Sequence, residues 1–183
     1  MTDPYINEDI GKFFYIGMKR ESDLFLIDPK ITDQVIKRKL KIINLGAGNQ
    51  KLLGAINFDL PEWDAESGVI PLPDESVGII HSHHFFEHIN NLKQILFECQ
   101  RVLVKGGSLY ITVPHWKGSM AYQDINHVNF FTLDTWKILF ANPFYDTRQG
   151  DKQEYKWKLK VLFNMVLGVK EENLALCTQM IKG

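Results

Sequence analysis

The chain has 183 residues, which is enough for one domain with a sizeable hydrophobic core. Its apolar content of 45% and charged content of 23% are ordinary for a globular protein. The formal net charge of -1 at pH 7 provides no field that would attract nucleic acid or an anionic membrane. The composition therefore argues against both a nucleic-acid partner and a membrane partner.

The cysteines and the first residues bear on the cellular compartment. Cys99 and Cys177 lie far apart in apolar surroundings, which is typical of free thiols in a reducing environment. The opening MTDPYINEDIGK is acidic and polar, whereas a secretory signal begins basic and continues apolar. No apolar run reaches the roughly 18 residues of a membrane-spanning helix. We expect a cytoplasmic protein.

The first part of the chain predicts an arm followed by two strands. Residues 1–38 mix aromatic and charged side chains, and we expect this arm to brace the domain rather than cover a crevice, with a short helix over 33–39. An apolar run at 40–45 predicts a buried strand, and 55–59 predicts a second. The ten residues between them, 46–55, are fewer than the dozen or so of a helical crossover, so a shortened connection is expected.

The middle of the chain predicts a loop, a strand, a helix and another strand. Three prolines favour a loop over residues 60–76, with at most a few strand residues near 68–70. Residues 77–82 predict a strand, and apolar side chains at a period of about 3.6 predict a helix over 86–103. Gly106-Gly107 is expected to end that helix. Residues 108–113 predict a strand that Pro114 stops.

The remainder predicts a helix and one or two strands. After a polar, aromatic loop at residues 115–131, Thr132 can cap a helix that runs through Phe140. Residues 141–153 are turn-rich, the alternation at 155–166 predicts a half-exposed strand, and 174–181 is either a strand or a short helix. Strands that alternate with helices around one glycine turn predict an α/β fold with a mainly parallel sheet.

Parallel strands would bring several strand ends to one edge of the sheet, where ligands bind. Gly46 and Gly48 would let the backbone turn sharply and admit a ligand, although two such glycines can also form a simple turn. Asp59 can accept both hydroxyls of a ribose or serve as a loop carboxylate. Asp64 or Glu66 can accept an adenine amino group, and the alternative is that both are solvated charges.

Histidines cluster after the strand at 77–82. His84 and His88 straddle the junction between that strand and the following helix, so we expect no metal site. Instead, His84 should line the crevice, while Glu87 and His88 open the helix, where a carboxylate is electrostatically favoured.

The loop at residues 115–131 would face the reacting centre. His127 in this loop can take a proton near neutral pH, with Asp124 to orient it. The alternative for His127 is a purely structural hydrogen bond. Aromatic side chains in the same loop can stack on a sugar or a planar metabolite, or can belong to the core.

Six segments, in this order, resemble the class I S-adenosylmethionine-dependent methyltransferases, and most closely a compact methyltransferase-11-like branch linked to surface-saccharide or bacteriophage gene sets. They span about half the chain: NLGAG at 44–48, INFD at 56–59, IPLPDESVGIIHS at 70–82, HFFEHI at 84–89, RVLVKGGSLYITVP at 101–114 and DINHVNFFT at 124–132. The last four are similar to the family's LPFPDESFDVV, HVLEHI, RVLKPGGxLxIxVP and DPxHVRxFT.

The resemblance implies a Rossmann-like, mainly parallel sheet flanked by helices, with a shortened first crossover and an antiparallel C-terminal strand. A single methyltransferase domain over 1–183 would comprise the arm at 1–38, a cofactor-binding core at 40–140 and C-terminal strands at 141–183. S-adenosyl-L-methionine would be the cofactor. The implied cofactor-binding residues are Asn44, Gly46, Ala47 and Gly48 in the first motif, Asp59 for the ribose, Leu60, Asp64 and Ala65 for the adenine, and His83 and His84 for the methionine portion.

The implied activity is methyl transfer by in-line displacement to a small-molecule or saccharide acceptor. His127 and Asp124 are the catalytic candidates. Asn44 replaces a more common acidic residue, Gly78 replaces an aspartate, and Gln50 replaces a third glycine, so an inactive accessory protein that binds the cofactor is the alternative. A nicotinamide-dependent dehydrogenase fits less well, because Lys51 stands where its fingerprint has a glycine. The sequence gives no indication of the oligomeric state.

Overall fold

The computed structural model describes residues 14–15, 26–27, 34–49, 51–52, 54–132, 134–136, 138, 157–166 and 174–183. The expected turns at 141–153 and the expected helix end at Phe140 lie outside these residues. Only two short strands and residues 34–38 are described from the N-terminal arm. None of the helices in the described ranges is long and apolar enough to cross a membrane.

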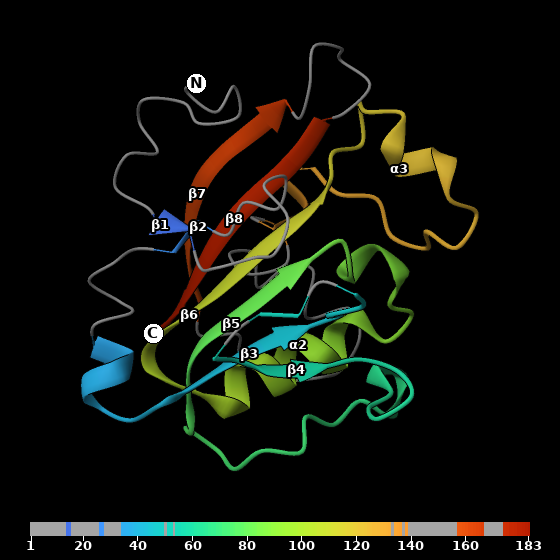
Figure 1. Cartoon of the computed structure of the whole chain (residues 1–183). Helices are drawn as coiled ribbons and strands as arrows, with labels where there is room; N and C mark the ends of the chain where they lie inside the picture. Colours follow the sequence, from blue (N-terminus) through green and yellow to red (C-terminus); the bar gives the residue numbers. More distant parts are fainter. Residues whose placement is uncertain are drawn as a thin grey trace.

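A six-stranded sheet, with strand order β4-β3-β5-β6-β8-β7, forms the centre of the molecule (Figure 1). The strands β4, β3, β5 and β6 run parallel, whereas β8 is antiparallel to both β6 and β7. Their bounds are β3 Lys41–Leu45, β4 Ile56–Phe58, β5 Val77–His83, β6 Leu103–Pro114, β7 Trp157–Val166 and β8 Leu174–Lys182. The predicted α/β fold with an antiparallel C-terminal strand is therefore confirmed, and residues 174–181 form a strand.

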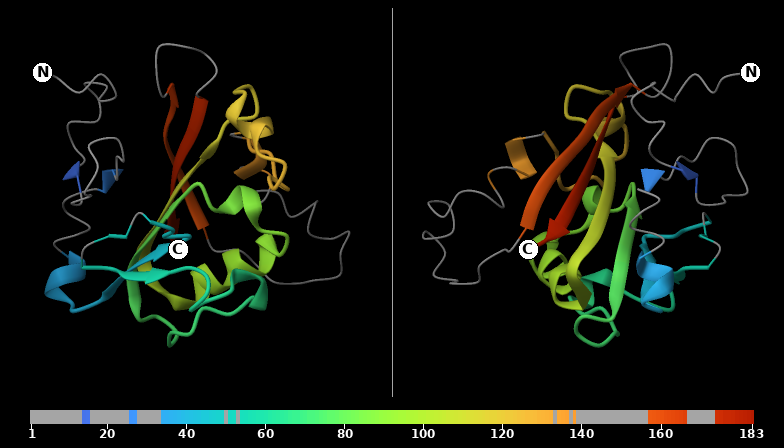
Figure 2. Two further views of the ribbon diagram at one scale, coloured as in Figure 1. Left: turned by 45° about the vertical axis from the view of Figure 1, so that its right-hand side comes forward. Right: turned by 90° about the vertical axis from the view of Figure 1, so that its left-hand side faces the viewer.

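Two layers of apolar side chains cover the sheet. The helix α2, Leu92–Val102, buries Ile95, Leu96 and Val102 on one face. On the other face, the helical turn at residues 34–37 places Val35 against Ile79. Figure 2 shows α2 and this turn on opposite sides of the sheet. Two further strands, β1 Phe14–Tyr15 and β2 Leu26–Ile27, pair antiparallel as a separate small sheet.

The first crossover is short, as expected, and side-chain hydrogen bonds hold it. The described residues between β3 and β4 form turns and no helix. The Asn57 side chain accepts a hydrogen bond from the Leu52 N–H (2.8 Å) and donates one to the Leu52 carbonyl (3.1 Å). The Gly46 and Ala47 N–H groups both donate to the Phe58 carbonyl (2.9 and 3.2 Å). These bonds close the loop without a helix and place the glycine turn beside the end of β4.

The helix predicted over residues 86–103 is wrong in its first third. A single 3-10 turn, η3 Phe86–His88, is followed by extended backbone at Ile89 (φ -92°, ψ 117°), and α2 begins only at Leu92. The break is stabilised from outside, because the Asn90 N–H donates to Glu66 (2.8 Å) and the Asn129 amide donates to the Ile89 carbonyl (2.6 Å). The helical spacing of apolar residues includes Ile89, but hydrogen bonds to other loops hold the backbone there in a non-helical conformation.

The prediction that Gly106-Gly107 ends the helix is also wrong. The helix ends at Val102, and β6 begins at the next residue. The two glycines lie in an irregularity of β6, since Val77 pairs with Leu103 but Ile79 pairs with Ser108. The Gly106 backbone has φ +78°, which favours glycine.

Cys99 is buried on α2 with a free thiol, as expected, and burial raises its pKa. Residues 60–76 form no strand, so the few strand residues considered near 68–70 are absent, and the segment contains the 3-10 turn η2, Ala65–Ser67.

Candidate active site

A cavity of about 410 Å³ opens at the carboxyl ends of β3, β4 and β5. This volume is in the usual range for a small-molecule site. Seven of the predicted cofactor-binding residues line it, namely Gly46, Gly48, Asp59, Leu60, Asp64, Ala65 and His84. Glu66, the predicted alternative to Asp64 for the adenine amino group, also lines it, whereas the sequence did not assign Trp63, Phe85, His88 and Ile89 to the cofactor.

The glycine turn forms one wall of the cavity. Gly46 and Gly48 have φ values of +69° and +47°, which side chains of L-residues rarely adopt. A Cβ on Gly46 would lie 2.5 Å from Cδ2 of Phe85, whereas one on Gly48 would project into open space, with only Asp59 Oδ2 within 4 Å. Both glycines are therefore required, Gly46 by packing and Gly48 by a space that a side chain would fill.

The Asp59 carboxylate lies beside this turn. Its Oδ1 accepts a hydrogen bond from the Leu60 N–H (2.8 Å), and its Oδ2 accepts one from the Gly48 N–H. Two backbone donors thus fix the carboxylate at the edge of the cavity, where a ligand with paired hydroxyl donors can approach it. A glycine cradle beside a fixed carboxylate fits a nucleoside cofactor of the expected type.

The loop after β4 supplies the adjacent wall. Asp64 caps η2 by accepting a hydrogen bond from the Glu66 N–H (2.9 Å), and Glu66 accepts one from the Asn90 N–H (2.8 Å). The Trp63 ring packs against Phe58 with ring centroids 5.4 Å apart, and its indole N–H donates to the Val69 carbonyl (2.7 Å). The lining of the cavity thus includes both aromatic and acidic side chains.

Three of the predicted cofactor-binding residues do not line the cavity: Asn44, Ala47 and His83. Asn44 is buried within the sheet, where it donates to Asn57 (3.0 Å) and accepts from His81 Nδ1 (2.8 Å). Burial, with a smaller effect of His83, lowers the pKa of His81, so a neutral imidazole faces a neutral amide. An acidic residue at position 44 would place a charge inside this neutral chain of side chains.

The His83 ring contacts the His84 ring edge to face, with the two ring centroids 4.4 Å apart. Burial, followed by the charge of His84, lowers the pKa of His83 to about 3, so the ring is neutral at physiological pH. The departure at Gly78 likewise has a packing reason, because a Cβ there would lie 2.3 Å from Val35 Cγ2.

His84 connects the cavity to a buried carboxylate. Its backbone is left-handed (φ +51°), and its N–H donates to the Thr112 carbonyl at 2.9 Å. Its Nδ1 donates to Glu87 Oε1 at 2.9 Å, and the Glu87 side chain is only 1% exposed. His84 lines the cavity, as expected. The expectation that Glu87 and His88 open the helix is wrong, because they lie in the separate turn η3 and α2 begins only at Leu92.

The loop after β6 brings His127 to the same region. The helix α3, Met120–Gln123, places the Ala121 carbonyl 3.0 Å from His127 Nδ1. The His127 ring lies 4.7 Å from the ring of His88, which lines the cavity. His127 is therefore beside the cavity.

Asp124 contacts Asn126 rather than the imidazole of His127. Its carboxylate accepts hydrogen bonds from the Asn126 N–H (2.8 Å) and side-chain amide (2.9 Å), and the backbone bond is the main reason that its pKa is lowered. The hydrogen bond that orients the imidazole comes from the Ala121 carbonyl. The Asp124 carboxylate can act on His127 only through its charge.

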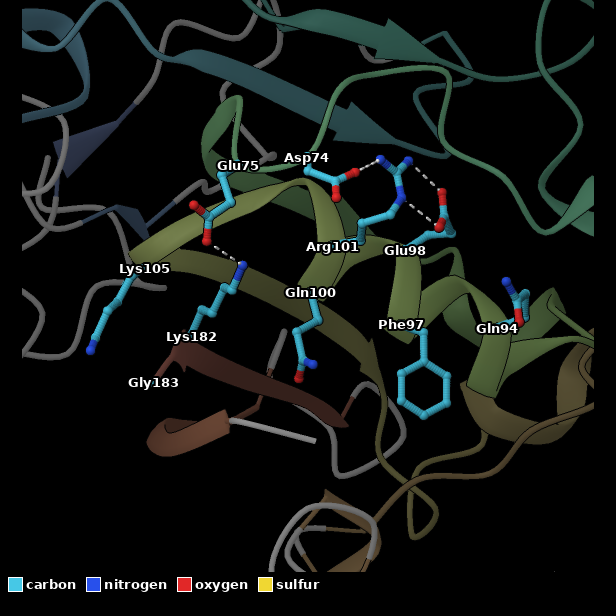
Figure 3. A pocket seen from close by; sticks show the side chains of 10 residues that line it. All are labelled: Asp74, Glu75, Gln94, Phe97, Glu98, Gln100, Arg101, Lys105, Lys182 and Gly183. Carbon is cyan, nitrogen blue, oxygen red and sulfur yellow. Dashed lines mark hydrogen bonds and ion pairs between the residues drawn. The ribbon is translucent and has the colours of Figure 1, made fainter. Parts of the chain in front are cut away.

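A second, larger cavity of about 850 Å³ lies at the opposite end of β5, between α2 and the end of β8 (Figure 3). Five of its charged side chains pair with one another. Arg101 contacts Asp74 (2.6 Å) and Glu98 (2.7 Å), and Lys182 contacts Glu75 (3.1 Å). This surface shares none of the lining of the first cavity.

Comparison with known proteins agrees with the fold. A family model described as a methyltransferase domain matches residues 38–111. No curated protein matches the chain. The chain is 12% identical to the YcgJ protein of Bacillus subtilis, with 83% of this chain and 97% of that one covered and a TM-score of 0.54. It is 14% identical to an S-adenosylmethionine-dependent methyltransferase from Archaeoglobus fulgidus, with 84% and 93% covered and a TM-score of 0.53.

A third similar structure is a chain of the complex between the Haloferax volcanii Trm112 methyltransferase activator and a putative methyltransferase. It is 12% identical, with 83% of this chain and 88% of that chain covered and a TM-score of 0.55. At such identities the likeness shows a common fold. The methyltransferase domain matched over residues 38–111, the motifs and this fold together support an S-adenosylmethionine-dependent methyltransferase, as the sequence predicts. Its cofactor is S-adenosyl-L-methionine.

Proposed function

We propose that this methyltransferase acts on a small-molecule or saccharide acceptor bound beside His88 and His127. The observation that carries the proposal is the position of the His127 ring, 4.7 Å from that of the cavity-lining His88. In the same loop, Tyr122 and Phe130 stack at 5.0 Å and are 60% and 47% exposed. This exposed aromatic pair offers a flat apolar surface of the kind that binds a sugar face or a planar metabolite.

The cofactor residues in this proposal follow the cavity. Asp59 would hold the ribose hydroxyls, Leu60 and Ala65 would contact the adenine, and the turn at Gly46 and Gly48 would pass the methionine portion. When bound, the cofactor supplies a methyl group already activated by its sulfonium. The protein's main task is then to hold a nucleophile in line with that methyl group, and such positioning can supply up to about 7–11 kcal/mol.

We assign His127 the part of proton acceptor for a hydroxyl or ammonium acceptor. A carbonyl oxygen only accepts hydrogen bonds, so the contact with Ala121 places the proton on Nδ1 and the lone pair on Nε2. Asp124, whose lowered pKa keeps it anionic, would favour the imidazolium through its charge. Phe131 takes no part in acceptor binding, because it is buried and stacks on Trp136 at 4.8 Å.

The test is an acceptor screen followed by a His127→Ala variant. Formation of S-adenosylhomocysteine would be measured with panels of small molecules, saccharides, proteins and nucleic acids. We expect turnover only with the first two panels, and we expect His127→Ala to lower turnover by about 10²- to 10⁴-fold while calorimetric affinity for S-adenosylmethionine stays unchanged.

The matched control is His115→Ala in the same loop, since the His115 side chain is also partly exposed and does not line the cavity. Unchanged turnover in His127→Ala would remove this residue from the mechanism. Turnover confined to proteins or nucleic acids would overturn the acceptor class.

The alternative of an inactive accessory protein was based on three departures from the family pattern, and two of them have a structural explanation. The packing of Val35 requires Gly78, and a neutral His81 suits Asn44, so neither departure indicates decay. A single domain over residues 1–183 and a cytoplasmic location remain predictions that accompany the proposed function.

A further inference from the structure

Three side chains near the cavity have the donor set of a cation site. Glu87 and His88 lie on the turn η3, and His127 lies in the loop after α3. One possible ligand atom from each lies within 4.8 Å of the other two. Among the residues that the structure describes, no other group of three or more histidine, cysteine, aspartate or glutamate side chains meets this distance criterion.

The Glu87 carboxylate is incompletely satisfied. Its side chain is 1% exposed, and Oε1 accepts the hydrogen bond from His84. Its Oε2 is buried and has no hydrogen-bond partner within the described part of the chain. A buried polar atom without a partner costs about 1–3 kcal/mol, and more when it belongs to a charged group. A cation bound at this oxygen would remove that cost.

His127 is oriented as metal-binding histidines usually are. In protein metal sites, a ligating imidazole commonly donates its other N–H to a carbonyl or carboxylate, which fixes the ring and its tautomer. The contact of His127 Nδ1 with the Ala121 carbonyl at 3.0 Å has this form and leaves the Nε2 lone pair as the ligand. The neighbouring His88 ring is close enough, at 4.7 Å between centroids, to share one ion.

Backbone contacts hold the two halves of the cluster together. The N–H groups of Val128 and Asn129 both donate to the Glu87 carbonyl, at 2.8 and 3.0 Å. The Asn129 amide also bonds to the Phe86 carbonyl at 3.1 Å. The residue next to His127 is thus fixed to the turn that carries Glu87 and His88, and a site supported in this way is preorganised.

We propose that Glu87, His88 and His127 bind one divalent cation of the borderline class, Zn²⁺ foremost, at the acceptor side of the cavity. Two imidazole nitrogens and one carboxylate oxygen suit zinc and neighbouring transition metals, whereas Mg²⁺ and Ca²⁺ require mainly oxygen ligands. Three protein ligands leave a coordination position open, as in catalytic rather than structural zinc sites.

Within the proposed function, the cation site would specify a hydroxyl acceptor. The activating role of the cation rests on the proposed function, whereas the binding of the cation does not. An acceptor hydroxyl bound at the open position loses its proton to solvent more readily than in water. Its oxygen then forms the bond to the methyl carbon as the bond from that carbon to the sulfonium breaks. In the loaded site, the Nε2 lone pair of His127 binds the cation, and the cation replaces the imidazole as the activating group.

Binding is tested without turnover. The protein, first dialysed against a chelator, is titrated with Co²⁺ and followed by visible absorption, and Zn²⁺ is then added as a competitor. We expect one Co²⁺ per chain, displaced by Zn²⁺ and not by a large excess of Mg²⁺. Glu87→Gln and His127→Asn should each weaken Co²⁺ binding by at least about tenfold, the scale of effect known for residues around metal sites.

Two controls separate a site from nonspecific binding. His115→Ala removes a histidine of the same loop and should leave Co²⁺ affinity unchanged, and calorimetry with S-adenosylmethionine checks that each variant retains its cavity. Glu87→Gln preserves the shape of a buried side chain, so it should fold even if larger changes fail. The proposed site would be overturned if the wild type bound no Co²⁺, or if Glu87→Gln and His127→Asn both bound Co²⁺ as tightly as the wild type.

Turnover gives the remaining distinction. With a hydroxyl acceptor from the screen, chelation should abolish methyl transfer and Zn²⁺ should restore it. Turnover that persists in chelator would overturn the activating role of the cation and leave the proton-acceptor role of His127 in place. Stoichiometric Co²⁺ binding without turnover on any acceptor would support the site while overturning the proposed acceptor chemistry.

Discussion

Substitution of Asp59 directly tests whether the cavity binds the cofactor. Its carboxylate is held by the Gly48 and Leu60 N–H groups and lies at the cavity edge. Hydrogen bonds to a charged group contribute about 1.5–3 kcal/mol, so we expect Asp59→Ala to weaken S-adenosylmethionine binding by about 10- to 100-fold in calorimetry. Glu62→Gln, three residues away and outside the cavity lining, should have no effect. Equal affinities in the two variants would place the ribose elsewhere.

The requirement for glycine at position 46 can be tested by measuring the free energy of unfolding. Gly46 and Gly54 both have positive φ (+69° and +82°), but only at Gly46 would a Cβ clash, at 2.5 Å from Phe85. Left-handed strain of about 1–2 kcal/mol applies to alanine at either position. We therefore expect Gly46→Ala to lower the free energy of unfolding by a further 1–3 kcal/mol or so relative to Gly54→Ala, as measured by urea denaturation. Similar losses would mean that Phe85 can move aside.

Single residues also show where sequence reasoning succeeds. Gly46, Asp59 and His84 follow strand ends, and strand ends are legible from apolar runs, so their place at the cavity was predictable. Asn44 lies inside β3, where alternate residues face opposite sides of the sheet, and its register partners are Asn57 and His81. That register depends on strand pairing, which the local sequence does not specify.

At the scale of elements, Glu98 and Arg101 attach α2 to the loop before β5. Glu98 accepts hydrogen bonds from Arg101 (Figure 3) and from the Ile70 N–H at 2.8 Å. Arg101 also donates to the Ile70 and Leu72 carbonyls, both at 2.9 Å. Burial raises the pKa of Glu98, but the bonds from Arg101 and Ile70 outweigh it, so the pKa is lowered below its ordinary value of 4.5.

A pH dependence follows from that lowered pKa. A carboxyl group with a lowered folded-state pKa stabilises the fold above its ordinary pKa, and the contribution is lost as the pH falls through the folded-state value. We expect Glu98→Gln to lower the free energy of unfolding at pH 7 by about 1–3 kcal/mol, with the difference from wild type shrinking as the pH falls below 4.5. Urea denaturation across this range is the measurement.

The control for this element is Asp74→Asn, because Asp74 pairs with the same Arg101 but is 74% exposed. An exposed ion pair contributes about 0–1 kcal/mol, so this change should be small at every pH. A difference between Glu98→Gln and wild type that does not vary with pH would contradict an ionised Glu98 as the stabilising group.

The same region shows why element boundaries were harder to predict than element types. The apolar spacing from Ile89 to Leu103 was real, and it correctly indicated that α2 packs on the sheet. The break before Leu92 arises from Glu66 and Asn129, which are distant in sequence and bond to the backbone there. A periodic pattern carries no information about such partners.

At the scale of the whole molecule, the sheet order was only partly accessible. The parallel strands follow from the alternation of strands and helices around the glycine turn, and they were predicted. The insertion of β8 between β6 and β7 pairs Thr112 with Cys177 and Val161 with Thr178. Because Thr112 and Cys177 lie far apart in the chain, the sequence patterns of β6 and β8 could not reveal that these two strands are neighbours.

The place of β8 predicts that the cavity depends on a strand that does not line it. The carbonyl of Thr112, on β6, accepts the bond from His84 N–H (2.9 Å), and β8 pairs with β6 along Ser108–Pro114. A chain that ends before Leu174 would expose the long β6 edge, which favours aggregation. We expect it to lose cooperative unfolding and S-adenosylmethionine binding, measured by denaturation and calorimetry, whereas removal of the exposed Gly183 alone should change neither. Cofactor binding by a soluble truncated chain would show instead that the four parallel strands form the cavity independently of β8.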